Sequence, residues 1–122
     1  MAILYVEDDS LTRQTIAGRL RRRGFQIVEA ASGEEALEVA GDGAQFDVAL
    51  LDVDLPGING LETLRRLRHN RPELPAVICS ASLGLGLRQP FRELGVPERH
   101  QLAKPCPLAD IVTALESAAS TV

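Results

Sequence analysis

The sequence predicts a doubly wound α/β fold, in which helices cover both faces of a five-stranded parallel sheet. Short apolar runs alternate with helical segments along the whole chain, and strict alternation of this kind is typical of parallel sheets. The 122 residues, of which 45% are hydrophobic and 25% charged, suffice for one domain with its own core. We therefore expect residues 1–122 to form a single domain.

Capping residues and glycines mark the elements of the first half of the chain. Ser32 and Asn59 have the character of helix N-caps, and each is followed three residues later by a glutamate. Ser10 opens an earlier helical segment, and Gly24 and Gly41 mark helix ends. The apolar runs between these signals predict strands at residues 3–6, 25–28 and 48–51.

The second half of the chain continues the alternation. Apolar runs predict strands at 76–79 and 100–103, separated by a looser helical region that has Pro90 near its start and ends at Gly95. A last helix follows Pro107, and it has the clearest amphipathic spacing in the chain. Its apolar positions i, i+3, i+4 and i+7 are Leu108, Ile111, Val112 and Leu115.

The polarity of the runs indicates the order of the strands. The first, third and fourth runs are apolar throughout, as interior strands are. The second contains Gln26, and the fifth contains His100 and Gln101, which edge strands tolerate. This pattern favours the flavodoxin-like order 2-1-3-4-5, whose ligand site lies at the carboxyl ends of the strands, near the switch between strands one and three.

Charge and composition exclude several classes of function. The net charge of −4 argues against direct binding of nucleic acid. No apolar run is long enough to span a membrane, and the N-terminus lacks an export signal. Cys79 and Cys106 are isolated in the sequence, and we expect two structural thiols rather than a disulfide or a metal site. Together these features predict a cytoplasmic protein.

Polar residues follow four of the predicted strands. Glu7, Asp8 and Asp9 follow the first strand, Asp52 the third, Ser80 the fourth and Lys104 the fifth. The carboxyl ends of parallel strands share one edge, and neighbouring strands lie about 4.8 Å apart. Carboxylates that close repel one another unless a cation lies between them. Oxygen ligands of this kind favour Mg²⁺, and Mn²⁺ is possible.

Each of these residues also has an ordinary structural explanation. Asp9 could equally be the N-cap of the first helix, and Asp54 resembles a common turn aspartate. Ser80 could be a local cap, and Lys104 a solvated surface amine. These explanations account for single residues, but they do not account for acids, a hydroxyl and a lysine meeting at successive strand ends.

Four segments resemble the receiver domain of two-component response regulators, the fold of the chemotaxis receiver. These segments are ILYVEDD, DVALLDVDLPGINGLE, PAVICSAS and LAKP, and they span nearly the whole chain in the family's order. The resemblance implies that Asp52 accepts a phosphoryl group from a phosphohistidine. The donor would be a sensor histidine kinase or a histidine phosphotransfer protein.

The resemblance also implies roles for the other residues of the site. Asp8, together with Glu7 acting through a water, would hold Mg²⁺ beside Asp52, and the backbone carbonyl of Asp54 would be a further ligand. Lys104 would pair with Asp52 and then with a phosphoryl oxygen, and the bond from Lys104 to Pro105 is expected to be cis. Ser80 would donate its hydroxyl to the phosphoryl group and draw its loop inward.

Three departures from the family pattern fall on the usual output face, which comprises the fourth helix and the fifth strand. Gln101 replaces an aromatic residue, so an aromatic rotamer switch is not expected. The segment from Ser80 to Lys104 is about two residues longer than usual. Leu83, Leu85 and Leu87 are expected in the core, with an exposed patch for a partner as the alternative. We expect the unknown output protein or effector domain to bind this face.

Two other functions compete with a phosphorylation-controlled signalling domain. The Asp52-x-Asp54 pair also fits a haloacid dehalogenase-type phosphatase, although the chain is short for that fold's substrate cap. A degenerate receiver that only binds protein is the other alternative, and the complete set of polar residues disfavours it. The signalling interpretation predicts a domain that catalyses its own phosphorylation and dephosphorylation but turns over no external substrate.

Overall fold

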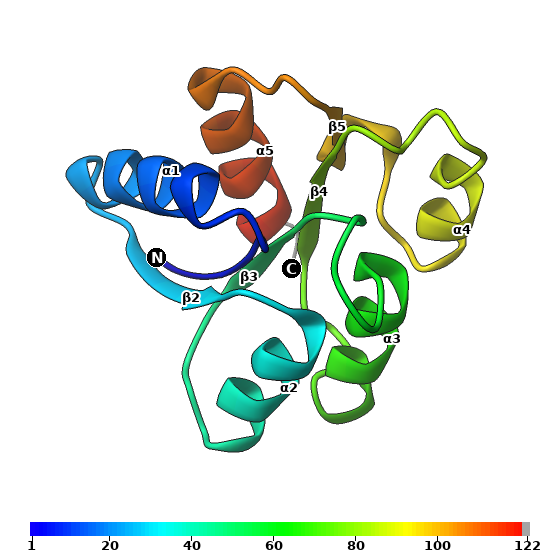
Figure 1. The fold of residues 1–122 in the computed structure, drawn as a ribbon, viewed down its shortest axis with the longest axis horizontal. Helices are drawn as coiled ribbons and strands as arrows, with labels where there is room; N and C mark the ends of the chain where they lie inside the picture. The colour runs from blue at the N-terminus through cyan, green and yellow to red at the C-terminus, as the bar shows by residue number, and fades with distance from the viewer. Residues whose placement is uncertain (121–122) are drawn as a thin grey trace.

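The computed structural model describes residues 1–120, and the order of its elements matches the predicted alternation (Figure 1). The elements are β1 (Ala2–Val6), α1 (Ser10–Arg22), β2 (Gln26–Ala30), α2 (Gly33–Gly41), β3 (Val48–Leu51), α3 (Gly60–Asn70), β4 (Ala76–Ser80), α4 (Arg88–Glu93), the 3-10 turn η1 (Glu98–His100), β5 (Gln101–Ala103) and α5 (Leu108–Ser120).

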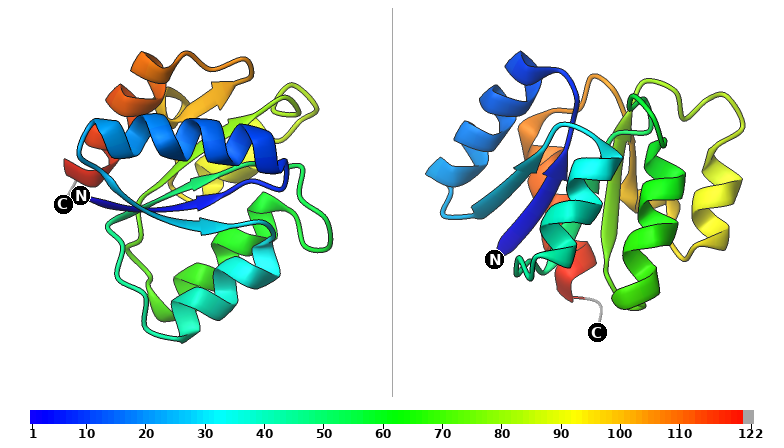
Figure 2. Two further views of the ribbon diagram at one scale, coloured as in Figure 1. Left: turned by 60° about the vertical axis from the view of Figure 1, so that its left-hand side comes forward. Right: turned by 60° about the horizontal axis from the view of Figure 1, so that its bottom comes forward.

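The five strands form one parallel sheet in the order β2-β1-β3-β4-β5, which confirms the predicted order. Helices α1 and α5 cover one face, and α2, α3 and α4 lie on the other (Figures 1 and 2). The strands predicted to be interior are interior, and the two that carry polar residues are the edges. The doubly wound, flavodoxin-like arrangement is thus confirmed.

Side-chain alternation explains why the interior strands are apolar throughout. Leu4 and Val6 of β1 pack beneath α2 and α3, whereas Ile3 and Tyr5 pack beneath α1 and α5. Successive side chains of a strand point to opposite faces, and both faces of this sheet are covered. Each interior strand therefore contributes to two hydrophobic clusters.

Side-chain caps begin three of the helices. Asp9, Ser32 and Asn59 accept hydrogen bonds from the backbone N–H groups three residues on, at 2.9, 3.0 and 2.9 Å. The hydrogen bonds from Thr12 also lower the pKa of Asp9. The structure thus gives Asp9 the capping role, one of the two roles left open for it, and confirms the predicted starts at Ser32 and Asn59.

The largest differences from the predicted elements lie between Ser80 and Lys104. Helix α4 has only six residues, and His100 lies in η1 rather than in β5. His100 is buried, and its Nε2 lies 3.0 Å from Ser117 Oγ of α5, a tertiary contact that the local pattern does not reveal. Of the three leucines, Leu83 is in the core, Leu87 is half-buried and Leu85 is exposed.

The expectation of two separate thiols is wrong. Cys79 and Cys106 form a disulfide with an S–S distance of 2.19 Å and a Cα–Cα distance of 6.8 Å. Cys79 pairs with Leu102 of β5, and the chain then turns after Lys104-Pro105 so that Cys106 lies next to β4. The two residues are 27 positions apart, and the strand register that joins them is not visible in their spacing.

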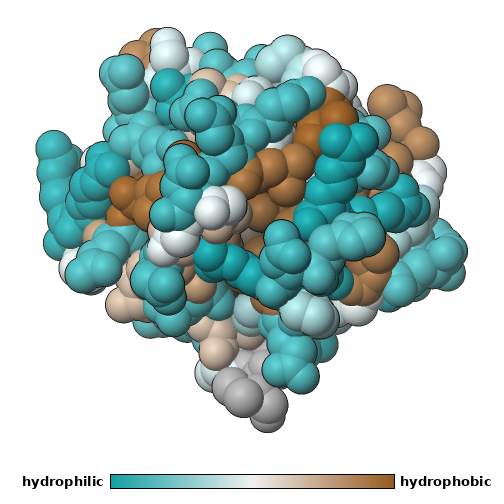
Figure 3. Space-filling view, turned by 90° about the horizontal axis from the view of Figure 1, so that it is seen from below, coloured by the Kyte–Doolittle hydropathy of each residue, from teal (hydrophilic) through white to brown (hydrophobic). Residues whose placement is uncertain are grey.

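Apolar surface is limited over the described part of the chain. Seen from the side of α2 and α3, the surface is mostly hydrophilic and is interrupted by smaller hydrophobic areas (Figure 3). The exposed large hydrophobic side chains among residues 1–120 are Met1, Leu11 and Leu85. Within the same residues, no helix combines the length and the apolar character needed to cross a membrane.

Candidate functional site

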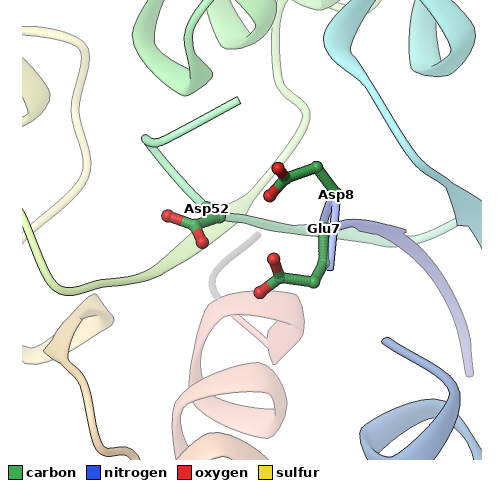
Figure 4. A group of neighbouring side chains, drawn as sticks. All are labelled: Glu7, Asp8 and Asp52. Carbon is green, nitrogen blue, oxygen red and sulfur yellow. The ribbon is translucent and has the colours of Figure 1, made fainter. Parts of the chain in front are cut away.

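Three carboxylates meet where β1 and β3 end. Val6 pairs with Leu51 in the sheet, so the residues that follow each of them emerge side by side. One oxygen of each of Glu7, Asp8 and Asp52 lies within 4.8 Å of the others, and the side chains approach a common space (Figure 4). Glu7 and Asp52 are buried and Asp8 is exposed. The predicted meeting of these acids is confirmed.

Lys104 brings a positive charge to this group. Its Nζ lies 2.7 Å from Glu7 Oε1 and 2.7 Å from Asp52 Oδ2, so it bridges the ends of β1 and β3. Burial alone would lower the pKa of Lys104, but the hydrogen bonds to Asp52 and Glu7 outweigh burial and raise it. The amine therefore stays charged and partly neutralises the two buried carboxylates.

The pKa of Glu7 is determined more by burial than by the contact with Lys104. Burial raises its pKa, and the hydrogen bonds from Lys104 and from Asp9 N oppose that change without reversing it. The difference follows from exposure, because the side chain of Glu7 is 3% exposed and that of Lys104 is 30% exposed. Desolvation therefore dominates at the carboxylate, whereas pairing dominates at the amine.

One hydrogen bond from the backbone and one from a side chain fix the orientation of the Asp52 carboxylate. Its Oδ1 accepts a hydrogen bond from Asp54 N at 3.0 Å, while Oδ2 accepts the bond from Lys104. The first residue of α3, Gly60, also lies close to the backbone of Asp52. A Cβ built on Gly60 would be 2.2 Å from the Asp52 carbonyl oxygen. Glycine at position 60 thus allows α3 to begin directly against Asp52, the residue that follows β3.

Ser80 lies near the carboxylates but bonds elsewhere. Its hydroxyl is buried and donates to Asp54 Oδ2 at 3.3 Å, and Ser82 Oγ donates to the two Asp54 carboxylate oxygens at 2.7 and 2.6 Å. The side chain of Asp54 therefore ties the β3–α3 loop to the β4–α4 loop. Sequence reasoning missed Ser82, although the repeated hydroxyls of the SAS segment were a signal.

Arg13 of α1 is a second residue that sequence reasoning missed. Its Nη1 donates to the Glu7 carbonyl oxygen at 2.7 Å, and its Nε lies 3.2 Å from Glu29 Oε1. These contacts hold the backbone at the end of β1. Nothing in the spacing of the sequence indicates them, because they depend on how α1 packs beside β2.

The bond from Lys104 to Pro105 is cis, as expected.

The chemistry of the donor set suits a hard divalent cation. Glu7, Asp8 and Asp52 offer oxygen atoms alone, and Asp8 faces solvent, so water can complete a coordination sphere. Mg²⁺ prefers oxygen ligands and retains several waters. Three carboxylates beside one lysine leave an excess of negative charge that a divalent cation would offset.

Comparison with known proteins agrees with this geometry. The family model of the response regulator receiver domain matches residues 3–116, and the chain belongs to this family. Receiver domains are signalling domains that interact with histidine kinases and output domains, and accepting a phosphoryl group is typical of them. With this assignment and with Asp54 bonded to the two serines, the phosphatase alternative is not supported.

Three individual proteins illustrate this similarity. It is 39% identical over 82 residues to the cell cycle transcriptional regulator CtrA of Caulobacter vibrioides, covering 67% of this chain and 35% of CtrA. The receiver domain of the hybrid histidine kinase CckA is 31% identical with a TM-score of 0.81, covering 98% of this chain and 100% of that one. TrrA of Thermotoga maritima, solved with Mg²⁺-BeF, is 24% identical with a TM-score of 0.82, covering 96% of this chain and 97% of TrrA, and shows the fold alone.

The curated relatives are longer than this chain. The chain spans between about a fifth and somewhat under half of their length. The match therefore concerns the receiver part of those proteins, and their remaining segments have no counterpart in these 122 residues.

Proposed function

We propose that Asp52 accepts a phosphoryl group from a phosphohistidine, with Mg²⁺ held beside it by Asp8 and Glu7 and by the backbone carbonyl of Asp54. One observation carries this proposal. A buried carboxylate lies within 4.8 Å of two further carboxylates and 2.7 Å from a lysine amine. Such a concentration of charge costs folding energy, and phosphoryl transfer is a reaction that uses it.

The reaction begins with an oxygen of Asp52 attacking phosphorus in line with the bond to the donor imidazole. The new O–P bond forms as the N–P bond breaks, and the imidazole leaves with the electron pair of that bond. The product is an acyl phosphate on Asp52. Bound Mg²⁺ would neutralise part of the charge on the phosphoryl oxygens.

Lys104 and Ser80 have complementary roles in this proposal. Lys104 holds Asp52 before transfer and then moves its bond to a phosphoryl oxygen. Ser80 exchanges its weak bond with Asp54, at 3.3 Å, for a charged one with the phosphoryl group. This exchange would draw in the β4–α4 loop and couple phosphorylation to the surface of α4 and β5.

The proposal also covers the extent of the domain, its location in the cell, its phosphoryl donor and its output partner. We take residues 1–122 to be one receiver domain that acts in the cytoplasm and turns over no external substrate. The phosphoryl donor would be a sensor histidine kinase or a histidine phosphotransfer protein, and Mn²⁺ could replace Mg²⁺. The output partner would be a protein that binds the α4–β5 face, with no direct contact to nucleic acid or membrane. The Mg²⁺-BeF complex of TrrA supports the choice of metal.

The decisive experiment supplies acetyl phosphate and Mg²⁺ to the full chain and measures acyl phosphate by mobility in a phosphate-binding gel. We expect Asp52→Asn to abolish the product and chelation of Mg²⁺ to prevent it. Asp54→Asn is the matched control, and we expect it to remain phosphorylated. Phosphorylation of Asp52→Asn at the wild-type level would refute the proposal. Failure of the wild-type chain to react would indicate the degenerate receiver, which only binds protein.

A further inference from the structure

The disulfide lies on the same side of the sheet as the phosphoryl-accepting carboxylate. Cys79 and Cys106 both pack against the hydrophobic cluster between the sheet and helices α1 and α5. A cavity of about 420 Å³ opens on this side, and its wall includes Cys79, Cys106, Asp52, Lys104 and Tyr5. The two sulfurs and the acceptor carboxylate thus border one space. Both cysteines are partly exposed, so small thiols and peroxides can reach them.

The disulfide also joins the two segments that carry Ser80 and Lys104. Cys79 directly precedes Ser80 at the end of β4, and Cys106 lies two residues after Lys104. With the bond formed, the segment that carries Lys104 is tied to β4, and Lys104 contacts Glu7 and Asp52 in this state. Breaking the bond removes the covalent tie on the C-terminal side of Lys104.

One restraint on that segment does not depend on sulfur. Lys104 N donates a hydrogen bond to the Ser80 carbonyl oxygen at 3.0 Å, so β5 stays joined to β4 after reduction. Beyond it, Pro105 and Pro107 are exposed and flank Cys106. We therefore expect reduction to loosen the position of the Lys104 amine without unfolding the domain.

We propose that Cys79 and Cys106 form a reversible redox site that controls how readily Asp52 accepts a phosphoryl group. Formation of the bond positions Lys104 and speeds acceptance, and its reduction slows acceptance. This inference rests on the proposed function of Asp52. In the cytoplasm proposed above, disulfides are usually transient and often serve as redox sensors rather than permanent staples.

Hydrogen peroxide can oxidise the two thiols to the disulfide, and a dithiol can reduce the disulfide again. Two thiols and one hydrogen peroxide give the disulfide and two waters, so sulfur loses two electrons and peroxide oxygen gains them. In the reverse direction, a dithiol reductant attacks the disulfide through a mixed disulfide and is itself oxidised to a disulfide, leaving both cysteines as thiols.

The test compares the oxidised and the reduced 122-residue chain. The chain has two cysteines, so thiol titration reports on this pair alone. We expect no reactive thiol after peroxide treatment and two after dithiothreitol. With acetyl phosphate and Mg²⁺, the rate of phosphoryl acceptance should fall about tenfold on reduction, which is less than the roughly hundredfold that a 1 Å misplacement can cost. Cys106→Ser should show the lower rate under both conditions.

Further outcomes separate the possible failures. Equal rates in the two redox states, with the pair fully oxidised and fully reduced, would overturn the inference and leave the proposed function intact. Two free thiols that persist in peroxide would overturn it as well. Loss of the folded circular dichroism spectrum on reduction would identify a purely structural bond. If neither redox state accepts a phosphoryl group, the proposed function itself fails.

Discussion

The carboxylate rim and the α4–β5 face of this receiver are built in contrasting ways. The rim comprises Glu7, Asp52 and Lys104, which directly follow β1, β3 and β5, and charged contacts hold them within hydrogen-bonding distance. On the α4–β5 face, a six-residue helix follows a loop in which Leu85 is 80% exposed, and the side-chain amide of Gln101 donates hydrogen bonds to α4 and to the segment after it.

This difference reflects what each region must do. Buried charges tolerate little displacement, because the loss of one partner leaves the other uncompensated. A surface that binds a particular partner is under no such constraint, and loops accept changes in length and composition. The rim therefore has the family's chemistry, whereas the α4–β5 face has features of its own.

Gln101 illustrates the second region. Its Nε2 donates to the carbonyl oxygens of Arg88 and Val96 at 3.2 and 3.0 Å, and Arg88 Nη1 donates to the Gln101 carbonyl oxygen at 3.2 Å. The side chain is buried, and its Oε1 has no hydrogen-bond partner within residues 1–120. A residue fastened in this way holds α4 against β5.

Apart from Asp52→Asn, which removes the acceptor itself, the largest effect on phosphoryl acceptance should come from Gly60→Ala. The added Cβ would lie 2.2 Å from the Asp52 carbonyl oxygen, so the end of β3 or the start of α3 must shift. We expect a loss of about 1–3 kcal/mol in the free energy of unfolding, typical of overpacking. The rate of acceptance from acetyl phosphate should fall about tenfold or more through misplacement of the carboxylate. Urea unfolding and the phosphorylation assay measure the two effects.

Gly18→Ala is the matched control for that change. Gly18 lies within α1, and a Cβ there meets no atom within 4 Å. Alanine should therefore stabilise the protein by about 0.5–1 kcal/mol through its better helix propensity and leave acceptance unchanged. If the two variants had the same stability and the same rate of acceptance, close packing of Gly60 against Asp52 would not be needed for phosphoryl acceptance.

A smaller loss of acceptance is expected for Glu7→Gln, together with a pH-dependent gain in stability. Burial raises the pKa of Glu7 above its ordinary value of 4.5, so the folded protein binds this proton more readily than the unfolded chain. The stability that follows is fully present below pH 4.5 and is lost as the pH rises through the folded pKa. Glutamine carries no charge and avoids that loss.

The variant should therefore be more stable than wild type at neutral pH, and the difference should shrink toward about pH 4. Urea unfolding in the presence of a chelator, at a series of pH values, measures this dependence without bound metal. Glu38→Gln, at an exposed position of α2, is the control and should follow wild type. A variant less stable than wild type at neutral pH would mean that pairing with Lys104 outweighs burial at Glu7.

The smallest effect on acceptance is expected for Gln101→Ala. Loss of its two side-chain hydrogen bonds should lower the free energy of unfolding by about 1–2 kcal/mol. The rate of phosphorylation should match wild type, because these bonds lie on the α4–β5 face. Gln14→Ala, at an exposed position of α1, controls for the loss of an amide. A tenfold slower phosphorylation of Gln101→Ala would contradict the separation of the two regions.

Much of this structure could be predicted from local signals. The apolar runs gave all five strands, the caps at Ser32 and Asn59 gave two helix starts, and the polarity of the edge strands gave the order of the sheet. The order of the sheet then implied that Asp8 and Asp52 lie together, because parallel strands end at one edge. Of the predicted fifth strand only His100 differs, because it lies in η1, where its side chain contacts α5.

The sequence by itself thus determined the fold and the residues gathered at the rim, since periodicity and strand polarity are local properties. Only the tertiary structure decided which partners those residues take. It joined Cys79 to Cys106, turned Ser80 and Ser82 toward Asp54, and set Arg13 against the end of β1. These contacts depend on strand register and helix packing across distant segments, and no spacing within a single segment encodes them.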